Sequence, residues 1–197
     1  ALLKKLVTIE DLKWIRLLYC YPKHFTDELI EVIAAEPKIC KYIDLPLQHG
    51  NNDILKAMHR QDTRQDIETL LQKIRQRIPG VTLRTSFIVG FPGETEAHFE
   101  DLKKFVTEQR FDRVGVFTYS QEEDTVAANL PNQISEETKQ ERYHDLMSLQ
   151  CKISEELNQE LEGQVLDILI EHPTEQANVF VGRSYREAPD IDGQIFI

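Results

Sequence analysis

Short apolar runs alternate with amphipathic segments along the first 120 residues of the chain. The apolar runs are rich in β-branched and aromatic residues, which is typical of parallel strands covered on both faces. Strands are expected over residues 14–21, 41–48, 81–90 and 113–120. Between them, apolar residues recur at steps of three and four, the spacing of helices with one buried face. The alternation predicts a right-handed parallel α/β arrangement, either an open sheet or part of a (β/α) barrel.

Helix boundaries follow from short polar side chains that precede the amphipathic segments. The expected N-caps are Thr26, Thr63 (or Asp62), Thr95 and Ser135. Pro37 ends the first of these helices near Glu36, and Gly163 ends the last near Glu162. Shorter helical segments are expected at residues 1–8 and around Ile54 to Met58.

The stretch from Val81 to Glu94 joins a buried strand to an abrupt turn. The strand ends at Gly90, and the Phe-Pro-Gly-Glu sequence that follows leads into the helix capped by Thr95. Ligands of α/β proteins sit at such strand ends, where glycine allows a close approach to the backbone. The pattern alone leaves open whether this is a ligand site or only a turn. The strand ends expected to share one face are Tyr21-Pro22, Gln48-His49, Gly90–Glu94 and Tyr119–Glu122.

The pattern changes after residue 133. A long polar helix with one apolar stripe is followed by three short strands, expected over residues 165–170, 177–182 and 194–197. We therefore expect three parts: residues 1–133, a linker helix over 134–162, and a small β domain over 163–197. The first residues form a helical pattern without a cap, and the last strands are too few to close a barrel. A piece of a longer protein is expected.

Cysteine spacing and hydropathy indicate the cellular compartment of the protein. Cys20, Cys40 and Cys151 are widely spaced and form no CxxC pair, so neither a disulfide framework nor a metal site is expected from them. No apolar run is long enough to span a bilayer, and no signal peptide pattern opens the chain. The expected protein is soluble and cytoplasmic, without a membrane partner.

The negative charge is concentrated in the last third of the chain. Residues 121–197 hold 17 acidic and 5 basic side chains, a balance of −12, which leaves +1 for residues 1–120 of the net −11. Such a surface repels phosphate backbones and attracts basic partners. A solvated acidic helix without a partner explains the charge equally well.

Several polar residues near the strand ends are candidates for ligand contacts. Gln48 offers an amide to a ribose or another polyol, and His49 is either an acid or base or a local hydrogen-bonding residue. Arg60 and Arg84 either bind a carboxylate or form ion pairs within the protein. No nucleophile with a visible base and no phosphate-binding loop is present. The residues alone indicate an α/β ligand-binding enzyme.

Three adjacent carboxylates, Glu122, Glu123 and Asp124, follow the fourth expected strand. They either receive a basic substrate or cap a loop. The choice stays open at this level.

Four stretches together resemble the radical S-adenosylmethionine methylthiotransferases: Tyr42–His49, Leu55–Arg60, Arg84–Glu94 and Phe117–Ser120. The resemblance covers nearly the whole chain. It implies a partial (β/α) barrel lacking its first strands, in which a [4Fe-4S] cluster cleaves S-adenosylmethionine and a methylthio group is installed on an unactivated carbon. The long helix and the last strands are similar to the linker and the start of the small β-barrel TRAM domain of such enzymes.

Two further stretches resemble one branch of that family. Phe117–Glu123 and Gly182–Gly193 look like the branch that modifies the β-carbon of an aspartate in a small-subunit ribosomal protein. Asp124 departs from the glycine usual in that branch. A basic ribosomal protein is the implied partner, and the acidic last third agrees with it. The branch that modifies tRNA adenosine is the alternative.

The resemblance also implies site residues. Gln48 matches a position near the cofactor ribose, and Ser86, Ile88 and Gly90 match the strand along the adenine. The strand at Val116 to Tyr119, which includes Phe117, is expected beside the adenine. Arg60 and Arg84 are candidates for the methionine carboxylate, and Glu122 and Glu123 for substrate binding. No catalytic residue is assigned within the chain.

The CxxxCxxC motif that holds the cluster in this family is not in the sequence. The resemblance therefore implies two [4Fe-4S] clusters in the full-length protein, with their ligands outside this chain, and a fragment that is inactive alone. Two other classes stay open. One is a non-radical (β/α) barrel enzyme using His49 or a carboxylate near Glu122 as a proton shuttle. The other is a module that recognises RNA or a ribosomal protein.

Overall fold

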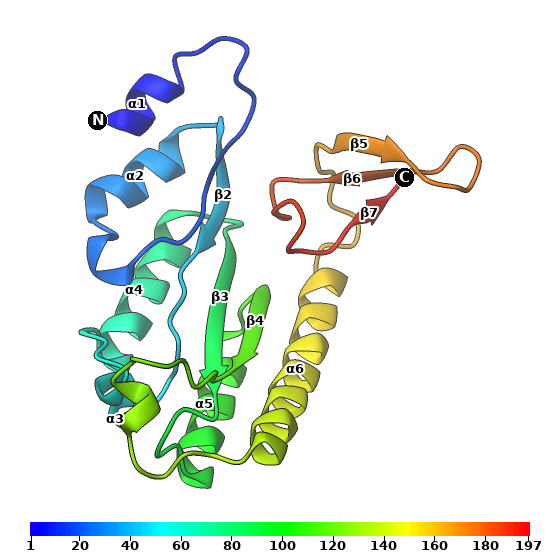
Figure 1. Ribbon diagram of the computed structural model, residues 1–197. Coiled ribbons are helices and arrows are strands. Elements are labelled where there is room, and N and C mark those ends of the chain that lie inside the picture. Colours follow the sequence, from blue (N-terminus) through cyan, green and yellow to red (C-terminus); the bar gives the residue numbers. More distant parts are fainter.

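The computed structural model describes all residues, Ala1–Ile197. It contains two sheets connected by one long helix (Figure 1). The first sheet has four parallel strands in the order β1-β2-β3-β4, and the second has three antiparallel strands in the order β5-β6-β7. The predicted parallel α/β class followed by a small β-rich segment is confirmed.

The parallel strands lie where the apolar runs predict them, but each is shorter than expected, β1 most of all. They are β1 (Ile15–Leu17), β2 (Ile39–Asp44), β3 (Thr82–Val89) and β4 (Arg113–Thr118). β1 stops early because Tyr19 takes a left-handed backbone conformation, with φ 55°. β2 ends before Pro46, which has no N–H to donate to a ladder. The chain rejoins the sheet through an isolated parallel bridge between Gln48 and Phe87.

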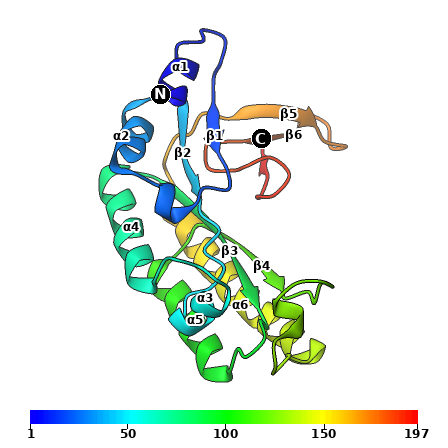
Figure 2. The same ribbon diagram turned by 60° about the vertical axis from the view of Figure 1, so that its left-hand side comes forward.

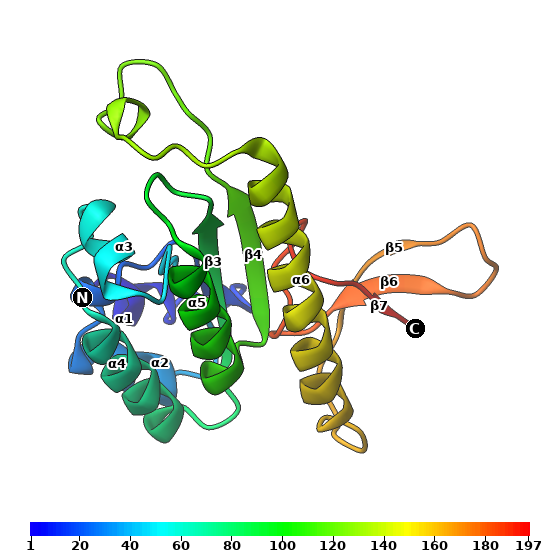
Figure 3. The same ribbon diagram turned by 90° about the horizontal axis from the view of Figure 1, so that it is seen from below.

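The helices of the first part gather on one face of the parallel sheet (Figures 1 and 3). They are α2 (Asp27–Ala35), α3 (Asn52–Ala57), α4 (Arg64–Arg77) and α5 (Glu96–Gln109), with α1 (Leu2–Leu6) preceding them. Leu83, Phe87 and Val89 of β3 face these helices and join a core with Phe105 and Phe111. Because strand side chains alternate, the residues between them face the other side of the sheet.

The expected N-caps are confirmed. The side-chain oxygen of each of these four residues accepts a backbone N–H of the following first turn: Thr26, Thr63, Thr95 and Ser135. Thr63, and not Asp62, is the cap of α4. It forms a reciprocal capping box with Asp66, and Thr95 forms one with His98.

The later part of the chain begins with a lobe that contains the short 3-10 helix η2 (Ala127–Asn129) and projects beside the carboxyl ends of β3 and β4 (Figure 3). Neither η2 nor η1 (Pro22–His24) was expected from the sequence. The long helix α6 (Glu136–Gln159) packs on β4 and α5. None of the helices combines the length and the apolar character needed to cross a membrane.

The small sheet consists of β5 (Leu169–Pro173), β6 (Phe180–Arg183) and β7 (Ile195–Phe196). Its first strand was expected to start at Val165, which is instead 97% exposed. β6 ends at Arg183, opposite Leu169, so no partner strand reaches the earlier residues. The small sheet lies beside the amino-terminal ends of β1 and β2 (Figure 2).

Candidate cofactor-binding site

A pocket of about 770 Å³ opens at the carboxyl end of the parallel sheet. Ten of the 17 residues that line it are hydrophobic, so its wall is mainly apolar with a few polar groups. This size and lining are typical of sites for small molecules and cofactors. Six of the eight residues predicted to bind a cofactor line this pocket: Gln48, Arg60, Ser86, Ile88, Phe117 and Tyr119.

Gln48 is positioned by the backbone of β3. Its N–H donates to the carbonyl of Ser86 at 2.9 Å, and its carbonyl accepts the N–H of Ile88 at 2.8 Å. The residue adopts φ 74°, a conformation that a non-glycine residue keeps only when its surroundings enforce it. The two hydrogen bonds provide that enforcement and fix the amide side chain at the pocket.

Ser86 and Ile88 share the face of β3 that points away from the helices, and they present a hydroxyl and an apolar side chain to the pocket. Phe117 lies in register beside Ile88 on β4 and is 56% exposed. An exposed aromatic ring next to an apolar wall offers a surface on which a flat ring can stack. Tyr119 packs edge-on against Phe91, with its ring centroid 5.3 Å away, and its buried hydroxyl has no hydrogen-bond partner.

Arg60 enters the pocket from the segment after α3. One guanidinium nitrogen donates to the carbonyl of Pro46 at 3.0 Å, and the group lies 4.5 Å from the centre of the Tyr21 ring. The remaining N–H groups have no protein acceptor and are available for an anion such as a carboxylate.

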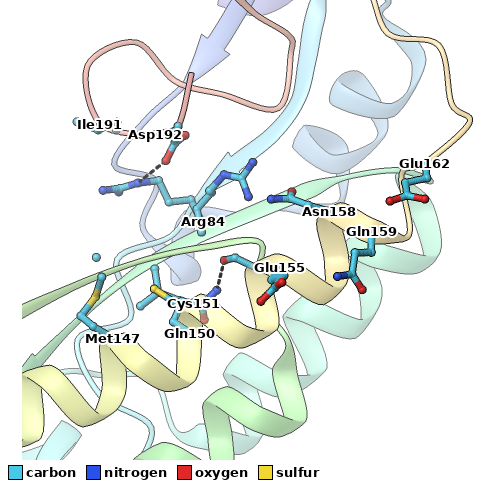
Figure 4. A pocket seen from close by; sticks show the side chains of 15 residues that line it. Arg84, Met147, Gln150, Cys151, Glu155, Asn158, Gln159, Glu162, Ile191 and Asp192 are labelled. Atoms are coloured by element: carbon cyan, nitrogen blue, oxygen red, sulfur yellow. Dashed lines mark hydrogen bonds and ion pairs between the residues drawn. The ribbon is translucent and has the colours of Figure 1, made fainter. Parts of the chain in front are cut away.

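The two other residues predicted to bind a cofactor, Arg84 and Gly90, lie outside the lining of this pocket. Arg84 lines a separate groove between the sheet and α6, where it bonds Asp44 at 2.9 Å and lies near Asp192 (Figure 4). Burial lowers the pKa of the Arg84 guanidinium, but the charge and hydrogen bond of Asp44 raise it above its ordinary value. Gly90 packs closely on Lys139 of α6, so that a Cβ at this position would overlap the Lys139 side chain. Neither residue lines the pocket.

Glu122 and Glu123 are exposed in the lobe beyond β4 and also lie outside the pocket lining. Glu122 accepts a hydrogen bond from the Ser120 hydroxyl at 2.6 Å, which makes it part of a local turn. Asp124 has φ 64° in that turn, a conformation that glycine adopts with less strain.

Sequence reasoning missed a buried ionic network behind the pocket. His49 and Glu94 are both fully buried, with Nε2 of His49 3.0 Å from Oε1 of Glu94. Nδ1 of His49 accepts the backbone N–H of Asn51 at 2.9 Å, so the proton of a neutral His49 is on Nε2 and is donated to Glu94. Both ring nitrogens are engaged. His49 is therefore a structural residue, which removes it as the proton shuttle of a non-radical barrel enzyme.

Arg142 of α6 completes this network. It donates to the Glu94 carboxylate at 2.9 Å and to the Glu94 carbonyl at 3.1 Å. The Glu94 carboxylate also accepts the backbone N–H of Gly90. One carboxylate therefore closes the turn and attaches it to α6. Nothing local in the sequence marks Arg142, since it lies 48 residues from Glu94.

Comparison with known families decides the class of protein. The model of the Radical SAM superfamily matches residues 1–106, which is more than half of the chain. The chain belongs to the radical SAM superfamily. Residues 163–197 match the model of the TRAM domain. Membership implies S-adenosylmethionine and [4Fe-4S] clusters as cofactors of a radical SAM protein.

Two curated proteins are more than 50% identical to this radical SAM chain over nearly its whole length. "Ribosomal protein uS12 methylthiotransferase RimO" of Desulforamulus reducens is 57% identical over 195 residues, covering 98% of this chain and 44% of the relative. The protein of the same name from Heliobacterium modesticaldum is 53% identical over 194 residues, covering 98% and 42%. The chain thus spans less than half the length of these relatives.

A solved structure supports the radical SAM fold. Coproporphyrinogen III oxidase (HemN) from Escherichia coli, described as a radical SAM enzyme, superimposes with a TM-score of 0.59 at 19% identity. The match covers 71% of this chain and 32% of that structure. The likeness confirms the (β/α) fold of the chain.

The pocket fits one of the two radical SAM cofactors. Its volume, its aromatic and apolar wall, the Ser86 hydroxyl and the unpaired Tyr119 hydroxyl suit a nucleoside-bearing molecule such as S-adenosylmethionine. The chain provides no ligand set for an iron–sulfur cluster. Its three free cysteines lie on separate elements: Cys20 after β1, Cys40 in β2 and Cys151 on α6.

Proposed function

We propose that this chain is part of a radical SAM methylthiotransferase that adds a methylthio group to the β-carbon of an aspartate in ribosomal protein uS12. The observation that carries the proposal is 57% identity over 98% of the chain to a protein named for that activity. The reaction would take place in the cytoplasm, where ribosomes are assembled.

The pocket at the carboxyl end of the sheet is the proposed site for S-adenosylmethionine. Gln48 would bind the ribose, Ser86 and Ile88 would lie along the adenine, and Arg60 would hold the methionine carboxylate. When bound at a [4Fe-4S] cluster, S-adenosylmethionine supplies the cleaved fragment that starts chemistry at an unactivated carbon. The apolar wall would limit the access of water to the bound molecule, and the exposed ring of Phe117 would offer a surface to its flat part.

The electrostatic asymmetry supports a protein substrate. Residues 121–197, which hold the lobe beside the pocket and all of α6, have a balance of −12. Such a surface favours the approach of a basic polypeptide and repels the phosphates of tRNA. Glu122 and Glu123, exposed on that lobe, are the proposed first contacts of the substrate.

The test uses the full-length protein, prepared without oxygen and with its clusters reconstituted. It is incubated with S-adenosylmethionine, a reductant and either purified uS12 or unmodified tRNA. The expected result is a methylthio mass increase on one aspartate of uS12 and none on tRNA. Modification of tRNA adenosine alone would overturn the proposed substrate. Tight binding of either partner without any modification would favour a recognition module.

A further inference from the structure

The segment that matches the TRAM domain contacts the parallel sheet through the loop Ser184–Asp192, here called the docking loop. It leaves β6 and lies against the face of the parallel sheet that is opposite the helices, at the amino-terminal end of the strands (Figures 1 and 2). The cofactor pocket opens at the other end of the same face. The two sites therefore share the strands between them.

Charged side chains attach the docking loop at several points. Arg16 of β1 donates to the carbonyl of Tyr185 at 2.7 Å, and Arg113 of β4 lies 3.2 Å from the Glu187 carboxylate. Arg186 reaches Asp112 at 2.7 Å. These contacts hold the loop across the sheet from its first strand to its last.

Asp192 pairs with Arg84, and this contact begins the connection between the docking loop and the pocket. One carboxylate oxygen accepts the Tyr42 hydroxyl at 2.6 Å and the N–H of Ala188 at 2.8 Å. The other oxygen lies 3.7 Å from Nε of Arg84. Only 2% of the Asp192 side chain is exposed, so this charge is screened little by solvent. Figure 4 shows Asp192 directed at Arg84 across the groove.

Arg84 continues the connection to the rim of the pocket. Its guanidinium bonds Oδ1 of fully buried Asp44 at 2.9 Å, and Oδ2 of Asp44 accepts the N–H of Tyr19 at 3.0 Å. Tyr19 lines the cofactor pocket, with 78% of the residue exposed. Its φ of 55° is a strained conformation that Asp44 helps to maintain. One chain of polar contacts thus runs from Asp192 to Tyr19.

We propose that Asp192 is a positioning residue for the S-adenosylmethionine pocket, acting through Arg84 and Asp44 on Tyr19. The inference rests on the proposed function only in naming the ligand. Asp44 is shared between Arg84 and the Tyr19 backbone, so the place of its carboxylate depends on where Arg84 lies. Asp192 fixes Arg84 from the opposite side. The TRAM segment is then a structural part of the cofactor site as well as an appended domain.

Asp192→Asn is the sharpest variant. The amide oxygen can keep the contacts with Tyr42 and Ala188, which leaves its NH2 group facing Arg84 in place of a carboxylate oxygen. The matched control is Asp190→Asn in the same loop. Asp190 is exposed, makes no ion pair or hydrogen bond, and has φ 67°, which asparagine tolerates.

Binding of S-adenosylmethionine to the full-length, reconstituted enzyme is measured by isothermal titration calorimetry, with circular dichroism melting as a check on folding. Asp192→Asn should weaken binding about three- to tenfold, the usual range for coupling through a polar network. Both variants should keep a cooperative melting transition, which shows that they are folded, and the melting temperature of Asp190→Asn should match that of the unsubstituted enzyme. Equal affinity of the two variants would overturn the inference. Absence of binding by the unsubstituted enzyme would instead refute the proposed function.

Arg84→Gln separates a positioning role from a purely structural one. If Asp192 acts through Arg84, the affinity loss of Arg84→Gln should not grow when Asp192→Asn is added. Additive losses would show that Asp192 acts by another route and would overturn the proposed connection.

Discussion

A residue type alone often leaves several roles possible. Burial and hydrogen-bond partners then decide which role the residue has. His49 and Gln48 are neighbours at one strand end, yet the first is fully buried with both nitrogens engaged, and the second lines the pocket. Sequence reasoning predicted Gln48 as a pocket residue and left His49 undecided. Arg84 was named as a candidate for the methionine carboxylate from its residue type and from the family resemblance, and it does share a face of β3 with Ser86. The strand is long enough to place it at the opposite end of that face, beside Asp192.

Arg142→Met tests the buried network at the level of one residue. The variant leaves the buried Glu94 carboxylate without its arginine partner. Removal of one partner of such a pair typically lowers the free energy of unfolding by about 3–5 kcal/mol. The free energy of unfolding is measured by urea denaturation monitored by circular dichroism. Arg142→Lys keeps the charge and should lose less. An unchanged urea midpoint for Arg142→Met would contradict the role given to the network.

The three cysteines should differ in their reactivity toward iodoacetamide in the native protein. Burial, followed by the charge of Asp44, raises the pKa of the Cys20 thiol to about 11, and burial also raises that of Cys40. Both stay protonated at pH 8, whereas Cys151 is exposed. Peptide mass spectrometry should find Cys151 labelled first. The rate at Cys20 should increase as the pH rises toward 11, because only the thiolate reacts. Fast labelling of Cys20 at pH 8 would contradict this assignment.

Element boundaries were predicted well where a local signal sets them. The threonine and serine N-caps are such signals, and all four were found. The lengths of β1 and β2 were overestimated, because the apolar runs continue past Tyr19 and Pro46, where backbone conformation ends the ladder. The packing of α6 on the turn after β3 could not be predicted. It depends on Lys139 and Arg142, which carry no periodic or motif signal that connects them to Gly90.

Gly90→Ala tests that packing of helix on turn. The new methyl group would clash with Lys139, and φ at Gly90 is +74°, so a loss of about 2–4 kcal/mol in unfolding free energy is expected. Gly93→Ala is the matched control, since its φ of +83° has a similar backbone penalty but nothing lies within 4 Å. It should lose only about 1–2 kcal/mol. Adding Lys139→Ala should recover part of the Gly90→Ala loss. Equal losses for both glycines would refute the steric explanation.

At the scale of the whole molecule, the sequence predicted a parallel α/β part, a long helix and a small β part. It did not predict that the last part returns to the first. The contacts of the docking loop join residues more than 70 positions apart, such as Arg113 with Glu187 and Arg186 with Asp112. Long-range ion pairs of this kind leave no repeating pattern in a single sequence, in contrast to the periodicity that marks helices and strands.

Arg186→Met tests the attachment of the docking loop. It removes the 2.7 Å ion pair with Asp112, whose other oxygen accepts the N–H of Leu83. Hydrogen–deuterium exchange should increase in residues 184–192, because the loop loses its anchor to Asp112, directly before β4. Peptides from α4, which lies on the other face of the sheet, serve as the internal reference and should not change. Unaltered exchange in the docking loop would show that this ion pair does not hold it.

The attachment of the docking loop limits how radical SAM chains of this kind can be recombined. Arg16, Tyr42 and Arg84 come from three different strands, and each meets a partner in the last fourteen residues of the chain. A chimera that takes its tail from a relative would bring a foreign loop to these side chains. Exchange of tails should therefore preserve the parallel sheet only when those strand residues are transplanted together with the tail.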